Sequence, residues 1–459
     1  MSTTRSESRN SVALAALLLV GALLTGCSVL GSDDDPAPAP SASAAPEDVV
    51  AALTHTLHAR AAAVRHEDFA RFMSGVARDR RPFVRDQRTY FDNLTQLPLA
   101  RFAYSFDPRE MVRSGDDYWV VVDVHLQLEG YDDLPVVTPD RYRFTPVAGR
   151  PGAFRLASVT DAGWEGRNDV HEQPWDSGPI EVRTSPGVLG IFDAGSSHAA
   201  TGLLSSVSRG IADVAGVVPY DWSRTVVVYA LSDETFLSSL DDLPGEDPDS
   251  VDGVAFPVAS TPDGGALAAT RFVLNPRMLD DPGVDRDRLI RHELTHVALG
   301  TRDDRAPVWL AEGIAEYVSV QALAPSEQRV GGVALAAAER GVSDLPDDAS
   351  FNDADSAAHY GLAWWACEYV ARSYGRQALW DLLDRLDRAG SSDAEQDQVL
   401  RSALGIDRRA LARRAARLMV VTFAPEPPAP PPTAPATTAP TPTTTPPTPA
   451  SPSSSPSED

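Results

Sequence analysis

The stretch "RLIRHELTHVALG", residues 288–300, places two histidines four positions apart, with a glutamate directly after the first. In an α-helix, residues at this spacing lie on one face, with Cβ atoms about 5–6 Å apart. His292 and His296 can therefore reach one ion from a single helix. Glu293 is rotated by roughly 100° from His292, so its carboxylate lies beside that ion rather than on it.

The flanking residues predict the limits of this helix. Asp285 or Asp287 can cap its start, and Gly300 can close it. The H-E-x-x-H pattern inside it is the signature of zinc metalloproteases, in which the histidines bind zinc and the glutamate serves as the general base. We therefore expect zinc as the cofactor, and we expect Glu293 to take a proton from the attacking water.

A second helix is predicted downstream, in "DDRAPVWLAEGIAEYVSV" (residues 303–320). Asp303 or Asp304 can cap its start. Its carboxylate Glu312 follows His296 by sixteen residues, which is enough for a short loop and an antiparallel return. Two imidazoles and one carboxylate, with a fourth position open, are the ligands of a hydrolytic zinc centre.

Together, "HELTH" (292–296) and "WLAEG" (309–313) resemble the gluzincins, the thermolysin- and aminopeptidase-like zinc peptidases, and the resemblance covers about residues 180–423. It implies the zinc ligands His292, His296 and Glu312. It also implies Glu293 as the general base, and Glu316 as a carboxylate that bonds to the first histidine and fixes its tautomer. The alternative for Glu312 and Glu316 is a solvated helix face.

The same resemblance implies a tyrosine that stabilises the oxyanion, several dozen residues after the second glutamate. Tyr360 in "AAHYGLAWWACEYVARSYG" (357–375) is the best candidate, with Tyr369 and Tyr374 behind it. The alternative for Tyr360 is a packing role at a helix start, and His359 could assist the oxyanion or lie at the surface. "DGGALAATRFVLN" lacks the Gly-x-Met-Glu-Asn segment with which related aminopeptidases bind the substrate amine, so endo- and exopeptidase action both stay open.

The rest of the chain predicts an α+β protein. Helical spacing from residue 47, followed by alternating strands such as 118–130, indicates a helix and an antiparallel sheet that resemble the NTF2-like or cystatin-like folds. A thermolysin-like gluzincin domain then follows, with a sheet above amphipathic helices. We expect five parts: a lipoprotein signal peptide (1–26), a Pro/Ala/Ser linker (27–46), an α+β accessory domain (47–177), a zinc metallopeptidase-like domain (178–423) and a disordered Pro/Thr-rich tail (424–459).

The start of the chain predicts a lipid anchor. The apolar run 12–24 is too short to span a bilayer and is typical of a signal-peptide core. It ends in Leu-Thr-Gly-Cys27, which resembles the lipobox of bacterial lipoproteins, so we expect acylation of Cys27 and a membrane-anchored protein outside the cytoplasm. The alternative is an ordinary signal peptide with an incidental cysteine. The other cysteine, Cys367, lies in an apolar helical pattern and is expected in the core.

Composition limits the partners. The 65 acidic and 40 basic residues give a formal net charge of −25, which argues against nucleic acid, because phosphate binding needs clustered positive charge. All the basic residues are arginine, a bias typical of high-GC actinobacterial genes. The expected partners are a peptide or protein substrate and the membrane.

These observations predict an exported, membrane-anchored, zinc-dependent peptidase. The alternative is a non-catalytic lipoprotein that uses the same fold as a binding or assembly module in the cell envelope. Glu293 separates the two hypotheses, because a purely structural zinc site needs its ligands but has no use for a base.

Overall fold

The computed structural model describes residues 46–168, 170, 172–240, 243, 248, 251–389 and 392–423, which all belong to one compact unit of the chain. The predicted signal peptide, Cys27, nearly all of the predicted linker and the predicted tail from residue 424 lie outside the described residues. Within the described part, no helix is both long and apolar enough to cross a membrane.

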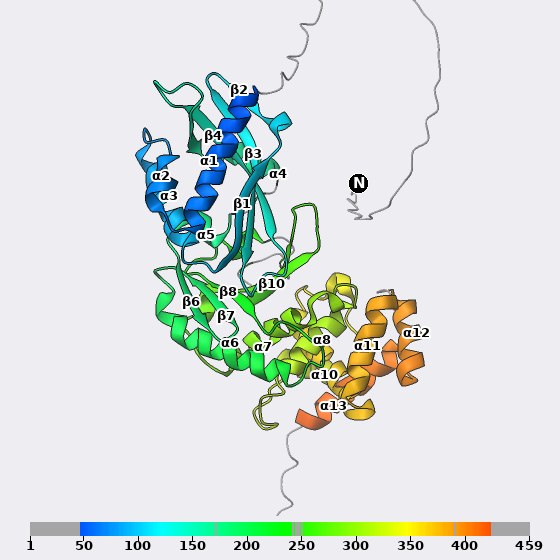
Figure 1. Ribbon diagram of the computed structural model, residues 1–459. Coiled ribbons are helices and arrows are strands. Elements are labelled where there is room, and N and C mark those ends of the chain that lie inside the picture. Colours follow the sequence, from blue (N-terminus) through cyan, green and yellow to red (C-terminus); the bar gives the residue numbers. More distant parts are fainter. Residues whose placement is uncertain are drawn as a thin grey trace, which may run out of the picture. The chain divides into compact units, whose positions relative to one another are not determined.

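The N-terminal region is a helix-covered antiparallel sheet, as the α+β prediction expects (Figure 1). Its strands are β1 (Leu99–Phe106), β2 (Val112–Ser114), β3 (Asp117–Leu128), β4 (Val136–Pro146) and β5 (Phe154–Ser158), in the order β1-β3-β4-β5, with β2 on the end of β3. Its main helices are α1 (Glu47–Arg65), α2 (Phe69–Ser74) and α3 (Arg81–Leu94). Alternation along β3 buries Val120, Val122, Leu126 and Leu128, which confirms the pattern in the sequence.

Two short helices, α4 (Ala162–Asn168) and α5 (Pro174–Ser177), lead to a second, mixed sheet. Its strands are β6 (Glu181–Ser185), β7 (Val188–Phe192), β8 (Val226–Ala230), β9 (Gly253–Ala259) and β10 (Leu267–Leu274), in the order β6-β7-β8-β10-β9. The three inner strands are parallel, and the connection from β7 to β8 contains α6 (Ala200–Ala215). The edge strands β6 and β9 are antiparallel to their neighbours.

Both faces of this second sheet are buried, each in a different core. Alternate residues such as Val188, Val228 and Phe272 pack in one core with the helices that follow in the chain. Their neighbours Leu189, Val227 and Val273 pack in the other core, with the N-terminal sheet. The hydrophobic core therefore continues across the boundary predicted at residue 178.

One buried ion pair fastens this junction. Arg271 on β10 donates to Asp132, in the loop after β3, at 2.8 Å, and the two side chains are 2% and 0% exposed. Arg271 also donates to the Tyr229 hydroxyl at 2.8 Å. Two backbone bonds join the same two sheets: the Asp133 N–H donates to the Ala268 carbonyl on β10, and the Val137 N–H on β4 donates to the carbonyl of Ser260, just after β9.

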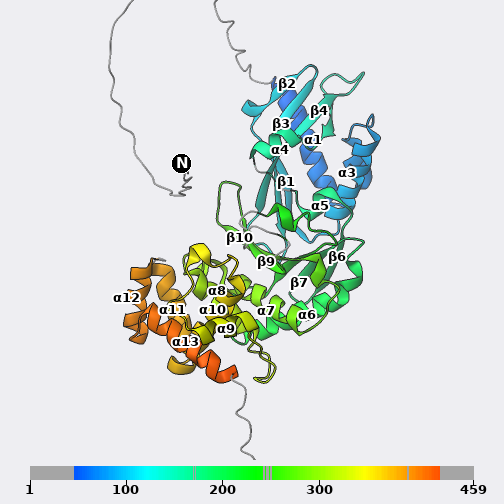
Figure 2. The ribbon, with the colours of Figure 1, turned by 180° about the vertical axis from the view of Figure 1, so that it is seen from behind.

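The C-terminal half is helical, as predicted (Figure 2). Its helices are α7 (Val284–Leu299), α8 (Val308–Ser319), α9 (Gly332–Arg340), α10 (Ser356–Tyr374), α11 (Arg376–Ala389), α12 (Asp393–Leu404) and α13 (Arg408–Phe423). Helix α10 packs against α8, α9, α11 and α13. Its Trp364, Trp365 and Cys367 are buried, which confirms that they are core residues.

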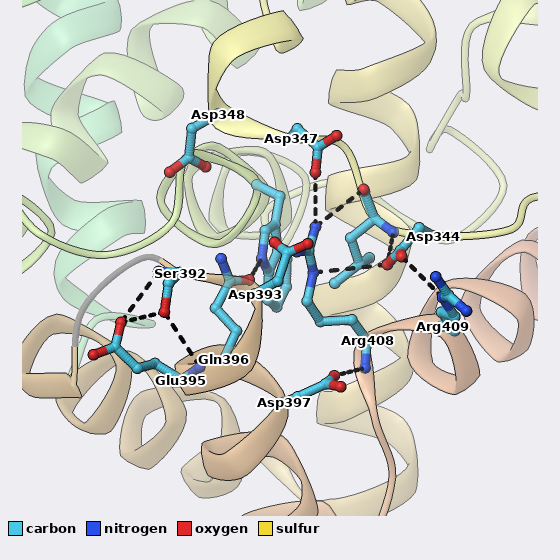
Figure 3. A network of polar contacts seen from close by, with 12 residues as sticks. Asp344, Asp347, Asp348, Ser392, Asp393, Glu395, Gln396, Asp397, Arg408 and Arg409 are labelled. Carbon is cyan, nitrogen blue, oxygen red and sulfur yellow. Dashed lines mark hydrogen bonds and ion pairs between the residues drawn. The ribbon is translucent and has the colours of Figure 1, made fainter. Parts of the chain in front are cut away.

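A polar network ties the last helices to the segment that precedes α10 (Figure 3). The Arg408 side chain is 3% exposed and pairs with Asp344, Asp347 and Asp393. In the same segment, the Asp348 carboxylate accepts a 2.9 Å hydrogen bond from the Val308 N–H at the start of α8. Helix α13 thus holds the segment 344–348, and this segment in turn bonds the start of α8, a helix that approaches the site described next.

Candidate metal centre

His292 and His296 lie on the buried side of α7, beneath the second sheet. The helix begins after Gly283 without a side-chain cap, so the prediction that Asp285 or Asp287 caps it was wrong. Both aspartates instead lie in the first turn, where negative charge stabilises a helix start. The predicted stop is confirmed, since Gly300 ends the helix with φ of 60°.

The two imidazoles and Glu312 on α8 converge on one point. His292 Nε2 lies 3.4 Å from His296 Nε2, and Glu312 Oε2 lies 3.1 Å from His292 Nε2 and 3.7 Å from His296 Nε2. Three ligands at the usual zinc distances of 2.0–2.1 Å, in tetrahedral geometry, are about 3.4 Å from one another. The donor set and its spacing therefore fit a zinc ion.

Each histidine has a carboxylate on its other ring nitrogen. Glu316 Oε1 lies 3.3 Å from His292 Nδ1, and Asp303 Oδ2 lies 3.2 Å from His296 Nδ1. Glu316 in turn pairs with Arg288. These contacts hold both rings with Nε2 toward the shared point, which is the arrangement that supports metal ligands.

Asp303 is a residue whose role the sequence analysis missed. It was expected to cap the second helix, but α8 begins after Pro307 and takes its partner from Asp348. The chain turns sharply at Gly300, which brings Asp303 back to His296. Its position seven residues after the second histidine, just beyond a helix-ending glycine, was the available signal.

Burial and neighbouring charges shift the pKa values of the three ligand side chains in opposite directions. Burial lowers the pKa of His292, but hydrogen bonds to Glu312 and Glu316 outweigh it and raise the pKa to about 10. The pKa of His296 is also raised well above its ordinary value, because Glu312 and Asp303 outweigh the lowering effect of burial. Burial would raise the pKa of Glu312, yet the two histidines lower it. In the metal-free protein the His292 imidazole is therefore protonated at neutral pH, and a metal ion must displace that proton.

Glu293 lies next to this cluster and is 6% exposed. Its Oε2 accepts a 2.6 Å hydrogen bond from the Ala255 N–H on edge strand β9. Burial raises the pKa of Glu293, and the neighbouring histidines partly oppose the shift. A raised pKa is what a general base that works near neutral pH requires.

The structure brings one of the three candidate tyrosines to the site. The Tyr360 ring lies 6.2 Å from the His292 ring, and its hydroxyl donates to Asn352 Oδ1 at 3.4 Å. Tyr369 and Tyr374 contact each other and do not line the cavity around the metal centre. His359 points its Nδ1 at the Phe351 carbonyl, 2.9 Å away, so it supports the segment before α10.

Close packing of α8 on α10 places Tyr360 near Glu312. At Gly313, a Cβ atom would lie 2.6 Å from the Ala363 carbonyl oxygen and 2.8 Å from Cys367 Sγ. Only a glycine fits there without displacing one helix. This contact gives a physical reason for the glycine that follows the third ligand in "WLAEG".

The metal centre opens into a cavity of about 1290 Å³, bounded by β9, α7, α8 and the start of α10. Its lining contains eight carboxylates: Asp252, Asp285, Glu293, Asp303, Asp304, Glu312, Glu316 and Asp353. Among the described lining residues, Arg288 is the only arginine, and it is already paired with Glu316. The cavity is strongly acidic.

Comparison with known proteins gives distant structural likeness alone. No family model and no curated protein matches the sequence. Among solved structures, a crystal structure of an M1 zinc metallopeptidase from Deinococcus radiodurans is similar over 62% of this chain and 62% of its own, with 18% sequence identity and a TM-score of 0.29. The chain thus spans less than two thirds of that structure, and a likeness this low carries no argument about activity.

Proposed function

We propose that this protein is a zinc-dependent peptidase with a thermolysin-like catalytic plan. The observation that carries the proposal is the convergence of His292, His296 and Glu312 at tetrahedral spacing, with Glu293 directly beside them. The outer carboxylates Glu316 and Asp303 support it, because they orient the two imidazoles.

The residues divide the work of peptide hydrolysis. Bound zinc would supply Lewis acidity that polarises the scissile carbonyl and makes water more acidic. Glu293, held by the Ala255 N–H, takes the proton from the attacking water and passes it to the leaving amine. Tyr360 donates its hydroxyl hydrogen bond to the developing oxyanion, and burial keeps it protonated by raising its pKa.

The charge of the cavity favours cationic substrates. Eight carboxylates and one arginine line it, so even a bound divalent ion leaves an excess of negative charge. Peptides with arginine or lysine near the scissile bond gain from this field, and acidic peptides are repelled. A peptide-library digest should therefore show cleavage enriched around basic residues.

We also propose that the protein is exported and anchored through an acylated Cys27, with its substrates outside the cytoplasm. The support is the short apolar run that ends in Leu-Thr-Gly-Cys. Cys27→Ser should release a processed protein from membrane fractions or leave the precursor unprocessed. Processed Cys27→Ser protein that still needs detergent for extraction would contradict this proposal.

The second candidate is a non-catalytic envelope module on the same fold. A structural zinc site needs His292, His296 and Glu312 but no base beside them. Glu293 is buried, positioned by a backbone hydrogen bond and next to the ligands, which favours the enzyme.

The decisive experiment compares wild type with Glu293→Gln, and uses Glu339→Gln, on the exposed side of α9, as the matched control. Glu293→Gln should keep about one zinc per chain and lose roughly 10²–10⁴-fold in turnover, the usual contribution of a general base. Glu339→Gln should behave like wild type. Cleavage that survives both Glu293→Gln and a chelator, or zinc-loaded wild type that cleaves no peptide in a library, rejects the peptidase.

A further inference from the structure

A second cavity lies in the N-terminal region, far along the chain from the metal centre. Its volume is about 340 Å³, and its walls come from α1, α2 and the β4–β5 hairpin. Leu57, Phe72, Phe144 and Leu156 give it an apolar interior. Ligand pockets usually occupy about 300–1,000 Å³, so this cavity suits a small molecule.

The charge of this lining is opposite to that of the protein. Arg60, Arg71 and His55 all line the cavity, and none of its described lining residues is Asp or Glu. The whole chain has 65 acidic and 40 basic residues, so a lining with basic groups alone departs from the composition. His55 and Arg71 are exposed, whereas Arg60 is 4% exposed.

Arg60 is a buried cation whose described partners are uncharged. Its Nε donates to the Tyr104 hydroxyl at 3.2 Å, and its Nη2 donates to Gln87 Oε1. Its guanidinium carbon lies 3.8 Å from the centre of the Phe72 ring and 5.5 Å from that of Tyr90. Burial raises the pKa of both tyrosines, which keeps their hydroxyls neutral.

One arm of this guanidinium has no partner. Within the described residues, Arg60 Nη1 is buried and makes no hydrogen bond. A buried charge without a counter-ion is costly, and buried cations are normally paired. An anion in the adjoining cavity would supply both the missing charge and the missing acceptor.

We propose that this cavity binds a small organic carboxylate with an apolar body. The carboxylate accepts a charge-assisted hydrogen bond from Nη1 of Arg60, the guanidinium nitrogen that has no acceptor within the described residues. The apolar body occupies the cavity beside Phe72, Phe144 and Leu156, and the exposed Arg71 attracts the anion at the rim. This site is independent of the metal centre and of peptide hydrolysis.

The test uses the purified full-length protein and three probes. 2-Naphthoate has the charge and the apolar body, 2-naphthalenemethanol has the body alone, and inorganic phosphate has the charge alone. We expect saturable binding of naphthoate by calorimetry, at least tenfold weaker binding of the alcohol, and no displacement by equimolar phosphate. Equal binding of the acid and the alcohol, or efficient displacement by phosphate, overturns the proposal.

Two variants locate the site. Arg60→Met replaces the buried cation with an apolar chain of similar length and should weaken naphthoate binding at least tenfold, while zinc content stays at the wild-type level. Arg71→Ala changes an exposed side chain, so it should fold normally and weaken binding a few-fold. Unchanged binding in folded Arg60→Met rejects the site, and if that variant does not fold, unchanged binding in Arg71→Ala rejects it.

Discussion

Glu293 accepts a 2.6 Å hydrogen bond from the backbone N–H of Ala255, which joins helix α7 to edge strand β9. The donor is a main-chain group on the side of β9 that faces away from β10, so it is available to the carboxylate. This bond orients Glu293, and it also limits how far burial can raise the pKa of the carboxylate.

Ala255→Pro removes that donor without changing any side chain in the metal centre. Proline is tolerated on edge strands, and β9 already contains Pro257. Without the bond the pKa of Glu293 rises further, so the acidic limb of the kcat/KM profile should move to higher pH while zinc content is unchanged. Ala255→Gly keeps the N–H and is the control, and an identical pH profile for the proline variant would contradict this role.

Substitution of the ligand Glu312 should lower zinc affinity more than substitution of the orienting carboxylates Glu316 and Asp303. Glu312→Ala removes a ligand and should abolish stable zinc binding. Glu316→Gln and Asp303→Asn keep the size of the side chain but weaken the support of a histidine, which usually costs about 10–100-fold in affinity. Zinc titration against a competing chelator measures all three, and tighter binding by Glu312→Ala than by Glu316→Gln would reverse the assignment.

Zinc binding should release at least one proton per ion at pH 7.5. The pKa of His292 is raised from 6.5 to about 10, so its imidazole is protonated before zinc displaces the proton, and the pKa of His296 is raised in the same direction. Calorimetry in buffers of different ionisation enthalpy counts the protons. A binding enthalpy that does not depend on the buffer would show that the imidazoles are already neutral.

The same raised pKa values affect the metal-free protein. A folded-state pKa above the unfolded value stabilises the fold fully below pH 6.5, and the contribution of His292 is lost as the pH rises toward about 10. The chelated protein should therefore lose stability across this window in urea denaturation, and the zinc-loaded protein should lose less. Equal pH dependence of the two forms would contradict the linkage.

Gly313→Ala should damage the metal centre by separating two helices. The new Cβ would lie 2.6 Å from a backbone oxygen of α10, so α8 must shift and take Glu312 with it. We expect a cost of about 1–3 kcal/mol in unfolding free energy and weaker zinc binding. Gly202→Ala on α6 meets no atom within 4 Å and is the matched control, which should be neutral or stabilising. Wild-type zinc affinity in Gly313→Ala would show that the contact is irrelevant to the site.

Arg271→Met should leave Asp132 as an unpaired buried charge. Removing one partner of a buried ion pair typically costs about 3–5 kcal/mol. Adding Asp132→Asn removes that charge and keeps an acceptor for the Leu128 N–H, so the double variant should recover at least half of the loss. Urea denaturation midpoints and slopes give the unfolding free energy of each variant. A double variant that is less stable than Arg271→Met would refute the explanation.

The sequence was sufficient for the parts of the site that depend on local geometry. His292, Glu293 and His296 lie within one helix, and Glu312 follows at a distance that a short loop can span, so their convergence was predictable. Strand β9 was not predicted; it contains Pro257, which is unfavourable in a central strand but is accepted on an edge. The contacts of Asp303 and Ala255 were missed because they depend on tertiary structure, which local capping and strand patterns do not encode.

Arg60 was missed for a related reason. It lies in α1, where an arginine is ordinarily expected to reach solvent, and it is enclosed by tertiary packing against α2, α3 and β1. Tyr360 was found because the family resemblance directed attention to its segment. Its helical pattern alone did not distinguish it from Tyr369 and Tyr374.

The two-sided burial of the second sheet affects how the chain can be cut. Leu189, Val227 and Val273 face the N-terminal sheet, so a protease acting near residue 178 would not release two soluble halves. Each half would expose an apolar surface and its own, now unpaired, member of the Asp132–Arg271 pair. A nicked molecule should therefore stay associated until it unfolds, and the C-terminal half, expressed by itself, should aggregate unless the N-terminal half is supplied in trans.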